Sequence, residues 1–455
     1  MTYDLIILGG GPAGYLAAER AGRAGLSIAL VEERSLGGVC LNEGCIPTKT
    51  LLYSAKLYDG ARLGEKYGVK AEGITIDHAV VLRRKNKVVK TLVAGVKAQM
   101  KANSVSVHMA RGVIKGKGAQ GFEVQAGEEM LTGKRLLIAT GSSAAVPPIE
   151  GLQEGLRSGF VLTNREILDL AEQPKRLCVI GGGVIGLELA SYFNSIGSEV
   201  TVVEMLDHIA GETDQDLVAI LKADLEKRGI RFELNARVTA VGQDSVRYEQ
   251  AGESKSVEAD KVLLSIGRRP NTRDLGLESL QVLVERGAVI TDDRMRTNVP
   301  DVYAAGDVNG RSMLAHTAYR EAEVAVSDML GHKDTMRYEA IPAVLYTNPE
   351  IASVGETEAT AARKGLPYKT VKLPMQYSGR YQAENEGGRG IMKLLVDPQT
   401  ERILGAHLLC NYSSEFIVLV TSFIEMGLQL EQIKKIVFPH PTVSEIIREA
   451  VFQYE

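Results

Sequence analysis

Short apolar runs alternate with helical patterns at two places in the chain, and the first begins near the N-terminus. Residues 5–8 are continuously apolar, as in a buried parallel strand, and lead directly into Gly9-x-Gly11-x-x-Gly14. A helical pattern follows over residues 15–24, and residues 26–32 form a second strand that ends in Glu32. This order predicts one complete βαβ unit.

The same order returns in the middle of the chain. Residues 177–180 form the first strand, Gly181-x-Gly183-x-x-Gly186 the turn, residues 188–196 the helix, and residues 200–204 a strand ending in Glu204. In both copies the third glycine and the acidic residue are 18 positions apart, from 14 to 32 and from 186 to 204. One such glycine pattern is weak evidence, whereas two complete units with matching carboxylates indicate two dinucleotide sites.

Each unit has the residues that a bound dinucleotide needs. The first glycine makes the tight turn, the second lets a pyrophosphate approach the backbone, and the third lets helix and strand pack closely. The N-terminus of the helix presents unpaired N–H groups to the phosphates. Glu32 and Glu204 are expected to accept hydrogen bonds from ribose hydroxyls. Because Glu204 would repel a 2′-phosphate, the second unit favours NAD over NADP.

Beyond about residue 337 the pattern changes. Two strands at 391–396 and 403–409 flank a turn, and helical stretches follow at 414–426 and 443–452. This pattern indicates an α+β domain. The expected fold is therefore α/β, with two Rossmann-like dinucleotide-binding domains and a C-terminal α+β domain.

Composition removes several classes of function. With 455 residues, 45% hydrophobic residues and a net charge of −4, the chain should be globular and form about three domains. Its charge offers no field for nucleic acid or an anionic membrane, and the basic stretch 83–101 is expected to be the solvated face of a helix. No apolar run reaches about 18 residues, and a strand begins too early for a signal peptide, so a cytoplasmic protein without membrane insertion is predicted. Four cysteines suit that compartment.

Two of the cysteines lie just after the first unit, in Gly37-Gly38-Val39-Cys40-Leu41-Asn42-Glu43-Gly44-Cys45-Ile46-Pro47-Thr48-Lys49. In a regular helix, residues five apart are too distant for a disulfide, so a Cys40–Cys45 bridge requires an irregular turn. Gly44 loosens the backbone there, and Pro47 fits the first turn of a helix that begins just past Cys45. The positive end of that helix would stabilise a Cys45 thiolate.

The cysteine pair also has two other possible roles, as structural thiols or as metal ligands. An isolated pair at this spacing could equally be two reduced structural thiols, but its position beside a dinucleotide-binding carboxylate favours redox chemistry. A zinc site lacks further Cys or His ligands nearby, so no metal is predicted. Cys178 lies in a predicted strand and should be a buried core thiol, and Cys410 has no partner near it in sequence.

The cysteine segment resembles the redox-active motif of the dihydrolipoyl dehydrogenase and glutathione reductase family, the class I pyridine nucleotide-disulfide oxidoreductases. Ala139-Thr140-Gly141-Ser142 resembles the family's crossover between flavin and nicotinamide domains, and Gly267-Arg268-Arg269-Pro270-Asn271 resembles the return. Tyr303-Ala304-Ala305-Gly306-Asp307 resembles its second flavin signature, and Met313-Leu314-Ala315-His316 should line the flavin. The resemblance implies an FAD-binding domain at 1–147, an NAD-binding domain at 148–268, a central domain at 269–336 and an interface domain at 337–455.

The resemblance also implies the site residues. FAD contacts are expected at Gly9, Gly11, Gly14, Glu32, Gly38, Lys49, Thr140, Gly141, Asp307, Met313 and Ala315. NAD contacts are expected at Gly181, Gly183, Gly186, Glu204 and Gly267. Lys49 matches the family's lysine beside the flavin, and Glu188 matches the carboxylate that pairs with it, so a Lys49–Glu188 ion pair is predicted.

Near the C-terminus, Phe438-Pro439-His440-Pro441-Thr442-Val443-Ser444-Glu445 resembles the family's His-Pro-Thr-x-Ser-Glu motif. In isolation His440 could be a loop histidine, and Thr442 with Glu445 a helix capping box. In the family the histidine takes a proton from the incoming dithiol, with the glutamate orienting it. It does so at the cysteines of the neighbouring subunit, which implies a homodimer.

The implied activity is that of a dihydrolipoyl dehydrogenase, with Cys40, Cys45, His440, Glu445, Lys49 and Glu188 catalytic, FAD and NAD as cofactors, and a lipoyl-bearing acyltransferase or glycine-cleavage carrier as partner. The alternatives are a glutathione reductase-like enzyme, which Glu204 opposes, and a non-catalytic flavoprotein subunit, which the retained motif residues oppose. Phe438, Ala322 and Cys410-Asn411 depart from the usual family pattern. These departures put partner choice and substrate tuning in doubt.

Overall fold

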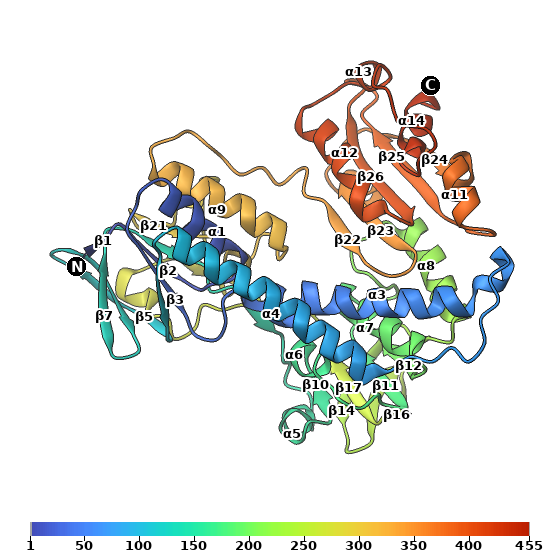
Figure 1. Ribbon diagram of the computed structural model, residues 1–455, viewed down its shortest axis with the longest axis horizontal. Helices are drawn as coiled ribbons and strands as arrows, with labels where there is room; N and C mark the ends of the chain where they lie inside the picture. Colours follow the sequence, from blue (N-terminus) through green and yellow to red (C-terminus); the bar gives the residue numbers. More distant parts are fainter. Residues whose placement is uncertain (1, 455) are drawn as a thin grey trace. The chain divides into compact units, whose positions relative to one another are not determined.

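The computed structural model describes residues 2–454, which form two compact units made of segments that alternate along the chain (Figure 1). The first unit combines the chain up to Thr50 with Ala79–Val146 and Gly267–Arg337. The second combines Leu51–His78, Pro147–Ile266 and the chain from Tyr338 onward. The first of these boundaries falls within α3 (Cys45–Arg62), and the next lies at the start of α4 (His78–Ala102).

A five-stranded parallel sheet forms the centre of the first unit. Its strand order is β21 (Val302–Ala304), β8 (Leu136–Ile138), β2 (Leu5–Leu8), β3 (Ile28–Glu32) and β4 (Ser106–Met109). All four residues of β2 are at most 2% exposed, as a central parallel strand requires. The predicted first βαβ unit is confirmed, although its helix α1 (Pro12–Arg23) begins earlier than predicted because Pro12 suits a first helical position. Helix α9 (Ala315–Met329) packs beside α1.

A second sheet of the first unit contains β1 (Thr2–Tyr3), β7 (Glu129–Gly133), β6 (Gly121–Ala126) and β5 (Gly112–Gly118). Burial alternates along β6, and its inward Phe122 and Val124 join the core beneath β8. The remaining strands of the unit form two pairs, a short hairpin of β19 (Val284–Glu285) and β20 (Ala288–Val289), and β9 (Ser142–Ala144) with β18 (Arg268–Pro270). The basic stretch lies on α4, as predicted, but Lys85 is only 2% exposed, so the expectation that all its charges are solvated was wrong for this residue.

The second βαβ unit lies in the second compact unit. Its parallel sheet has the order β10 (Val161–Leu162), β17 (Lys261–Leu264), β11 (Arg176–Ile180), β12 (Glu199–Val203) and β13 (Arg231–Glu233). Helices α7 (Val184–Ser195) and α8 (Gln215–Lys227) follow β11 and β12, and α5 (Leu152–Ser158) and α6 (Asn164–Ile167) precede them. A meander of β14 (Ala236–Val241), β15 (Ser245–Gln250) and β16 (Glu253–Glu258) was not predicted. Cys178 on β11 is fully buried, which confirms the predicted core position.

The C-terminal part of the second unit is an antiparallel sheet with helices, which confirms the predicted α+β arrangement. The strand order is β22 (Ala343–Leu345), β23 (Glu350–Gly355), β26 (Ile403–Cys410), β25 (Ile391–Val396) and β24 (Lys369–Pro374). Helices α12 (Ser413–Glu425) and α14 (Glu445–Phe452) bury their apolar faces in its core, and α10 (Glu358–Arg363), α11 (Gly379–Glu384) and α13 (Leu430–Ile433) are short. Cys410 lies in this core at 0% exposure.

One charged residue is buried in this sheet. Lys393 on β25 has a side chain that is only 2% exposed, and its Nζ lies 2.6 Å from Asp214, 2.8 Å from Asp216 and 2.5 Å from Glu358. Asp214 is itself 3% exposed and caps the N-terminus of α8 through the Asp216 N–H. The ion cluster therefore ties the C-terminal sheet to the helix that follows the second nucleotide-binding strand.

Candidate active site and nucleotide-binding sites

The turn between β2 and α1 accepts only glycine at two of the predicted positions. Gly9 has φ +104°, and a Cβ added there would lie 2.2 Å from the Ala139 carbonyl oxygen. A Cβ on Gly14 would lie 1.8 Å from the Gly9 oxygen. Within residues 2–454 no side chain caps α1 at Gly11, and its first turn holds no acidic residue. The N–H groups at this helix end are therefore available to an anion, as a pyrophosphate site requires.

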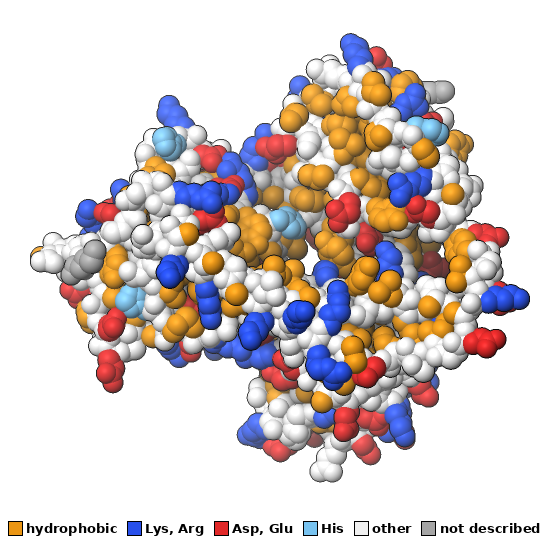
Figure 2. Space-filling model, in the orientation of Figure 1, with side chains coloured by type: hydrophobic (Ala, Val, Ile, Leu, Met, Phe, Trp, Pro, Cys, Tyr) orange, Lys and Arg blue, Asp and Glu red, His pale blue; other side chains and the backbone are white. Residues whose placement is uncertain are grey.

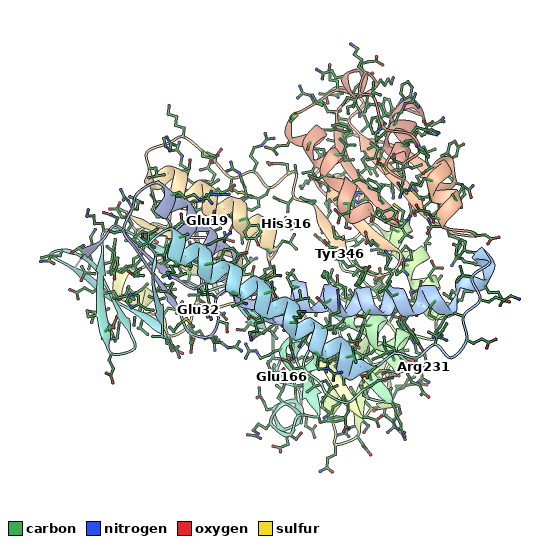
Figure 3. All side chains as sticks on the ribbon, in the orientation of Figure 1. Glu19, Glu32, Glu166, Arg231, His316 and Tyr346 are labelled. Carbon is green, nitrogen blue, oxygen red and sulfur yellow. The ribbon has the colours of Figure 1, made fainter. Side chains whose placement is uncertain are left out.

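Glu32, at the end of β3, is held in place by backbone donors (Figure 3). Its Oε2 accepts a hydrogen bond from Gly10 N at 2.7 Å, and its Oε1 accepts from Arg34 N at 2.7 Å and Ser35 N at 3.0 Å. These bonds fix the carboxylate beside the glycine turn. Oε2, which accepts only one of these bonds, keeps acceptor capacity for a ribose hydroxyl.

The second copy repeats this arrangement. A Cβ on Gly186 would lie 2.3 Å from the Gly181 oxygen, and Gly183 begins α7 without a side-chain cap from any residue in the described range. Glu204 Oε2 accepts from Gly182 N at 2.6 Å, and Oε1 accepts from Leu206 N at 2.8 Å. The two sites therefore share helix ends and carboxylates of one design, and both fit a dinucleotide.

The crossover segments pair with each other in the first unit. β9 (Ser142–Ala144) is antiparallel to β18 (Arg268–Pro270), and Thr140 Oγ1 donates to the Asn271 oxygen at 2.7 Å. Gly141 has φ +68° and Gly267 has φ +118°, and both backbone conformations favour glycine. The Gly267 carbonyl accepts from Ala145 N at 2.9 Å.

Asp307 lies beside this pair of strands. Its carboxylate accepts a short hydrogen bond from Ser142 Oγ, which in turn accepts from Arg268 Nε at 2.7 Å. The preceding Gly306 donates its N–H to the buried Glu321 carboxylate at 2.6 Å. No role was predicted for Ser142, Arg268 or Glu321, although the first two lie inside the two crossover motifs. Ala315 begins α9, two residues after Met313.

The cysteines lie on two helices separated by one glycine. Cys40 is on α2 (Gly38–Glu43), and α3 begins at Cys45 itself. Gly44 between them has φ −148° and ψ −107°, outside the helical region, which confirms the irregular turn. The helix was predicted to begin just past Cys45; it begins one residue earlier, and Pro47 still lies in its first turn. The two thiols contact each other through a side-chain hydrogen bond.

This contact separates the ionisation of the two thiols. The hydrogen bond with Cys45, and then burial, raise the pKa of Cys40 well above its ordinary value, whereas the positive charge of Lys49 lowers it. Cys45 lies at the N-terminal end of α3, where the helix dipole favours a thiolate. The arrangement is therefore suited to a thiolate on Cys45 that accepts a hydrogen bond from the Cys40 thiol.

Two tyrosines beside the cysteines were not singled out from the sequence. Tyr15 on α1 and Tyr319 on α9 bring their hydroxyl oxygens to 2.5 Å, and their rings meet edge to face at 6.0 Å. Burial is the largest cause that raises the pKa of both phenols, and the charges of Cys40 and Cys45 raise both further. Their separation in sequence gave no signal that they meet.

His440 and Glu445 meet in the second unit. His440 Nδ1 lies 2.8 Å from Glu445 Oε1, and Glu445 Oε2 accepts from Thr442 N at 2.8 Å. Partial burial raises the pKa of Glu445, but the hydrogen bonds from Thr442 and His440 outweigh it and the pKa lies below its ordinary value. Glu445 thus serves both as the capping residue and as the partner of the histidine. The imidazole itself is 77% exposed.

Glu188 and Lys49 belong to different compact units, and the ion pair between them stays a prediction. Glu188 is 2% exposed on α7, and its Oε1 accepts a hydrogen bond from Tyr346 N at 3.0 Å. Tyr346 is labelled in Figure 3. Because the donor is the backbone N–H of Tyr346, the pattern of side chains in the sequence could not predict this bond to Glu188.

Comparison with known proteins agrees with this geometry. The chain matches the model of the pyridine nucleotide-disulphide oxidoreductases over residues 3–322 and that of their dimerisation domain over residues 341–451. The chain belongs to this family. Dihydrolipoyl dehydrogenase of Mycoplasma pneumoniae is 37% identical over 99% of this chain and 98% of that protein. The Geobacillus stearothermophilus enzyme of the same name is 38% identical over 98% and 95%.

Solved structures show the same relationship. LpdA from Mycobacterium tuberculosis has 27% identity and a TM-score of 0.90, with 99% of each chain covered. The HOCl-induced flavoprotein disulfide reductase RclA from Escherichia coli has 28% identity and a TM-score of 0.86, with 100% of each chain covered. The α/β fold with its appended dimerisation domain is therefore confirmed.

The family and its relatives use FAD and NAD, which confirms both predicted cofactors. The chain is an FAD-dependent, NAD-linked disulfide oxidoreductase. Its dimerisation domain supports a homodimer. Among the helices formed by residues 2–454, none is long and apolar enough to cross a membrane.

Proposed function

We propose that the substrate is protein-bound dihydrolipoamide, which the protein oxidises to lipoamide while NAD is reduced. The observation that carries this proposal is the thiol pair, with Cys45 at the start of α3 and Cys40 in hydrogen-bond contact with it. Full-length relatives named dihydrolipoyl dehydrogenase support the choice of substrate.

In the proposed reaction, His440 takes a proton from the incoming dithiol. Glu445 orients the imidazole through the 2.8 Å bond to Nδ1 and stabilises the charge that forms. The substrate thiolate attacks Cys40 of the oxidised pair, and Cys45 leaves as a thiolate. The second substrate thiolate then attacks the mixed disulfide and releases lipoamide. FAD, when bound, would supply the redox chemistry that links the dithiol of Cys40 and Cys45 to NAD.

The cofactor roles of individual residues belong to this proposal. The first unit would hold FAD through Gly9, Gly11, Gly14, Glu32 and Gly38, then Lys49, and on the other side Thr140, Gly141, Asp307, Met313 and Ala315. The second would hold NAD through Gly181, Gly183, Gly186 and Glu204, with Glu188 near the nicotinamide. Gly267, the remaining proposed NAD contact, belongs to the return segment in the first unit. The domain limits at 147, 268 and 336 follow the same division.

We further propose that His440 acts on the cysteines of the partner subunit. Its 77% exposure and the 93% exposure of nearby Val437 support a surface that a second copy covers. Hydrophobic side chains also gather over α12 and its neighbours (Figure 2), where Val418 and Met426 are 57% and 72% exposed. The lipoyl group would arrive on an acyltransferase or a glycine-cleavage carrier protein.

The test is a steady-state assay of the purified protein with dihydrolipoamide and NAD, run beside glutathione disulfide with NADPH and with NADH. Rapid NADH formation from dihydrolipoamide is expected. Turnover of glutathione disulfide alone would transfer the protein to a glutathione reductase-like function, and no turnover of either would favour a non-catalytic flavoprotein.

A further inference from the structure

The hydroxyl groups of Tyr15 and Tyr319 form a buried pair between α1 and α9. Their oxygens are 2.5 Å apart, Tyr15 is 8% exposed, and Tyr319 is half-buried. A pair of phenols has two O–H protons, and one hydrogen bond between them uses only one. Among residues 2–454, no other side chain or carbonyl bonds to either hydroxyl, so one proton of the pair is left to donate.

The cysteine segment lies against the same end of α1. Gly37 N donates to the Gly10 oxygen at 2.8 Å, and a Cβ on Gly38 would lie 2.6 Å from Gly11 Cα. This contact sets α2 against the first turn of α1, one turn before Tyr15. Cys40 lies only two residues after Gly38. The charges of both cysteines accordingly reach both phenols.

We propose that Tyr319 donates this remaining hydrogen bond to the sulfur of Cys40 when that sulfur is a thiolate. The more deeply buried Tyr15 donates to Tyr319 and holds it in place, as a positioning residue. This inference rests on the proposed oxidation of dihydrolipoamide, because Cys40 becomes a thiolate during that reaction.

When the second substrate thiolate attacks the mixed disulfide, the bond between Cys40 and the substrate breaks and the substrate's own disulfide forms. The substrate is oxidised by two electrons, the cysteine pair is reduced by two, and Cys40 leaves as a thiolate. A hydrogen-bond donor at this sulfur makes it a better leaving group. Cys45 and Lys49 are the other titratable groups that act on Cys40.

The test compares Tyr319→Phe with Tyr15→Phe and with Tyr248→Phe, a control that removes a 4%-exposed phenol hydroxyl from β15. In each reduced, flavin-loaded protein, the alkylation rate of Cys40 by iodoacetamide is followed against pH through its peptide in mass spectrometry. Because a hydrogen bond to a charged group is lost, Tyr319→Phe should raise the pKa of Cys40 by about one unit and slow alkylation at neutral pH about tenfold. Dihydrolipoamide turnover should fall by a similar factor.

Tyr15→Phe should give a smaller effect in the same direction, since Tyr319 keeps its proton but loses its anchor. It is the second variant if Tyr319→Phe does not fold. An alkylation profile of Tyr319→Phe equal to that of the Tyr248→Phe control would overturn the inference. A shifted Tyr319→Phe profile, in a protein whose wild type does not oxidise dihydrolipoamide, would refute the proposed substrate and leave the tyrosine assignment standing.

Discussion

The buried Lys393 cluster allows a stability prediction worked directly from the structure. Lys393→Met keeps the length and apolar stem of the side chain but removes a charge shared by three carboxylates. Asp214, only 3% exposed, would keep a buried negative charge without its 2.6 Å partner. Breaking a buried pair in this way costs about 3–5 kcal/mol. Lys372→Met is the matched control, because Lys372 contacts the same Asp216 at 2.7 Å but is 46% exposed, and exposed pairs contribute at most about 1 kcal/mol.

Thermal unfolding of the holoenzyme, followed by circular dichroism, measures the difference. At about 1 °C per kcal/mol for a chain of 455 residues, Lys393→Met should lower the midpoint by about 3–5 °C and Lys372→Met by at most about 1 °C. The pKa of Asp216 is lowered mainly by hydrogen bonds from Lys372 and Lys393; that of Glu358 is raised by burial but lowered more by Lys393 and Thr370. The two carboxylates therefore contribute to the free energy of unfolding above their unfolded-state pKa. This contribution is lost as pH falls through their folded-state pKa, which is lower.

The gap between wild type and Lys393→Met should therefore shrink below about pH 4. A Lys393→Met protein that melts with the Lys372→Met control at neutral pH would show that the buried cluster does not stabilise the fold. A gap that widens with acid would contradict the predicted pH dependence.

Three further substitutions test the nucleotide sites and the histidine. Gly14→Ala should abolish FAD retention, measured by the flavin-to-protein absorbance ratio, because the added Cβ would lie 1.8 Å from a backbone oxygen. The control Gly95→Ala on α4 adds a Cβ with nothing within 4 Å and should retain FAD. Glu204→Gln should narrow the preference for NAD over NADP about tenfold or more in kcat/KM, since the charge that repels a 2′-phosphate is gone; an unchanged ratio would argue against Glu204 at the ribose. Glu445→Gln should lower kcat for dihydrolipoamide about tenfold or more with flavin content unchanged, because the charge beside His440 is lost; full activity would remove Glu445 from the mechanism.

The parts of the fold that could be predicted are those with a local signal. Each copy of the βαβ unit lies within about thirty residues, so short-range patterns were enough to predict it. This holds for the strands β2 and β11, the glycine turns after them, and the carboxylates Glu32 and Glu204. The break at Gly44 was also readable, since spacing and disulfide geometry together demand it.

What could not be predicted depends on contacts between distant segments. The meander β14–β16 has no strong alternation, because β16 is exposed along nearly its whole length. Tyr15 and Tyr319 are 304 positions apart, and Lys393 lies 179 positions from Asp214. Lys85 looked like a solvated charge because its neighbours on α4 are exposed, yet it is buried. In each case tertiary packing, which one sequence does not display, decides the environment.

The most direct test of the central claim is NADH formation from dihydrolipoamide and NAD by wild type and by Cys45→Ser, with both proteins loaded with FAD. Wild type should turn over rapidly, and Cys45→Ser should lose turnover while it retains its flavin. A Cys45→Ser protein that oxidises dihydrolipoamide at the wild-type rate would contradict the role of the Cys40–Cys45 pair.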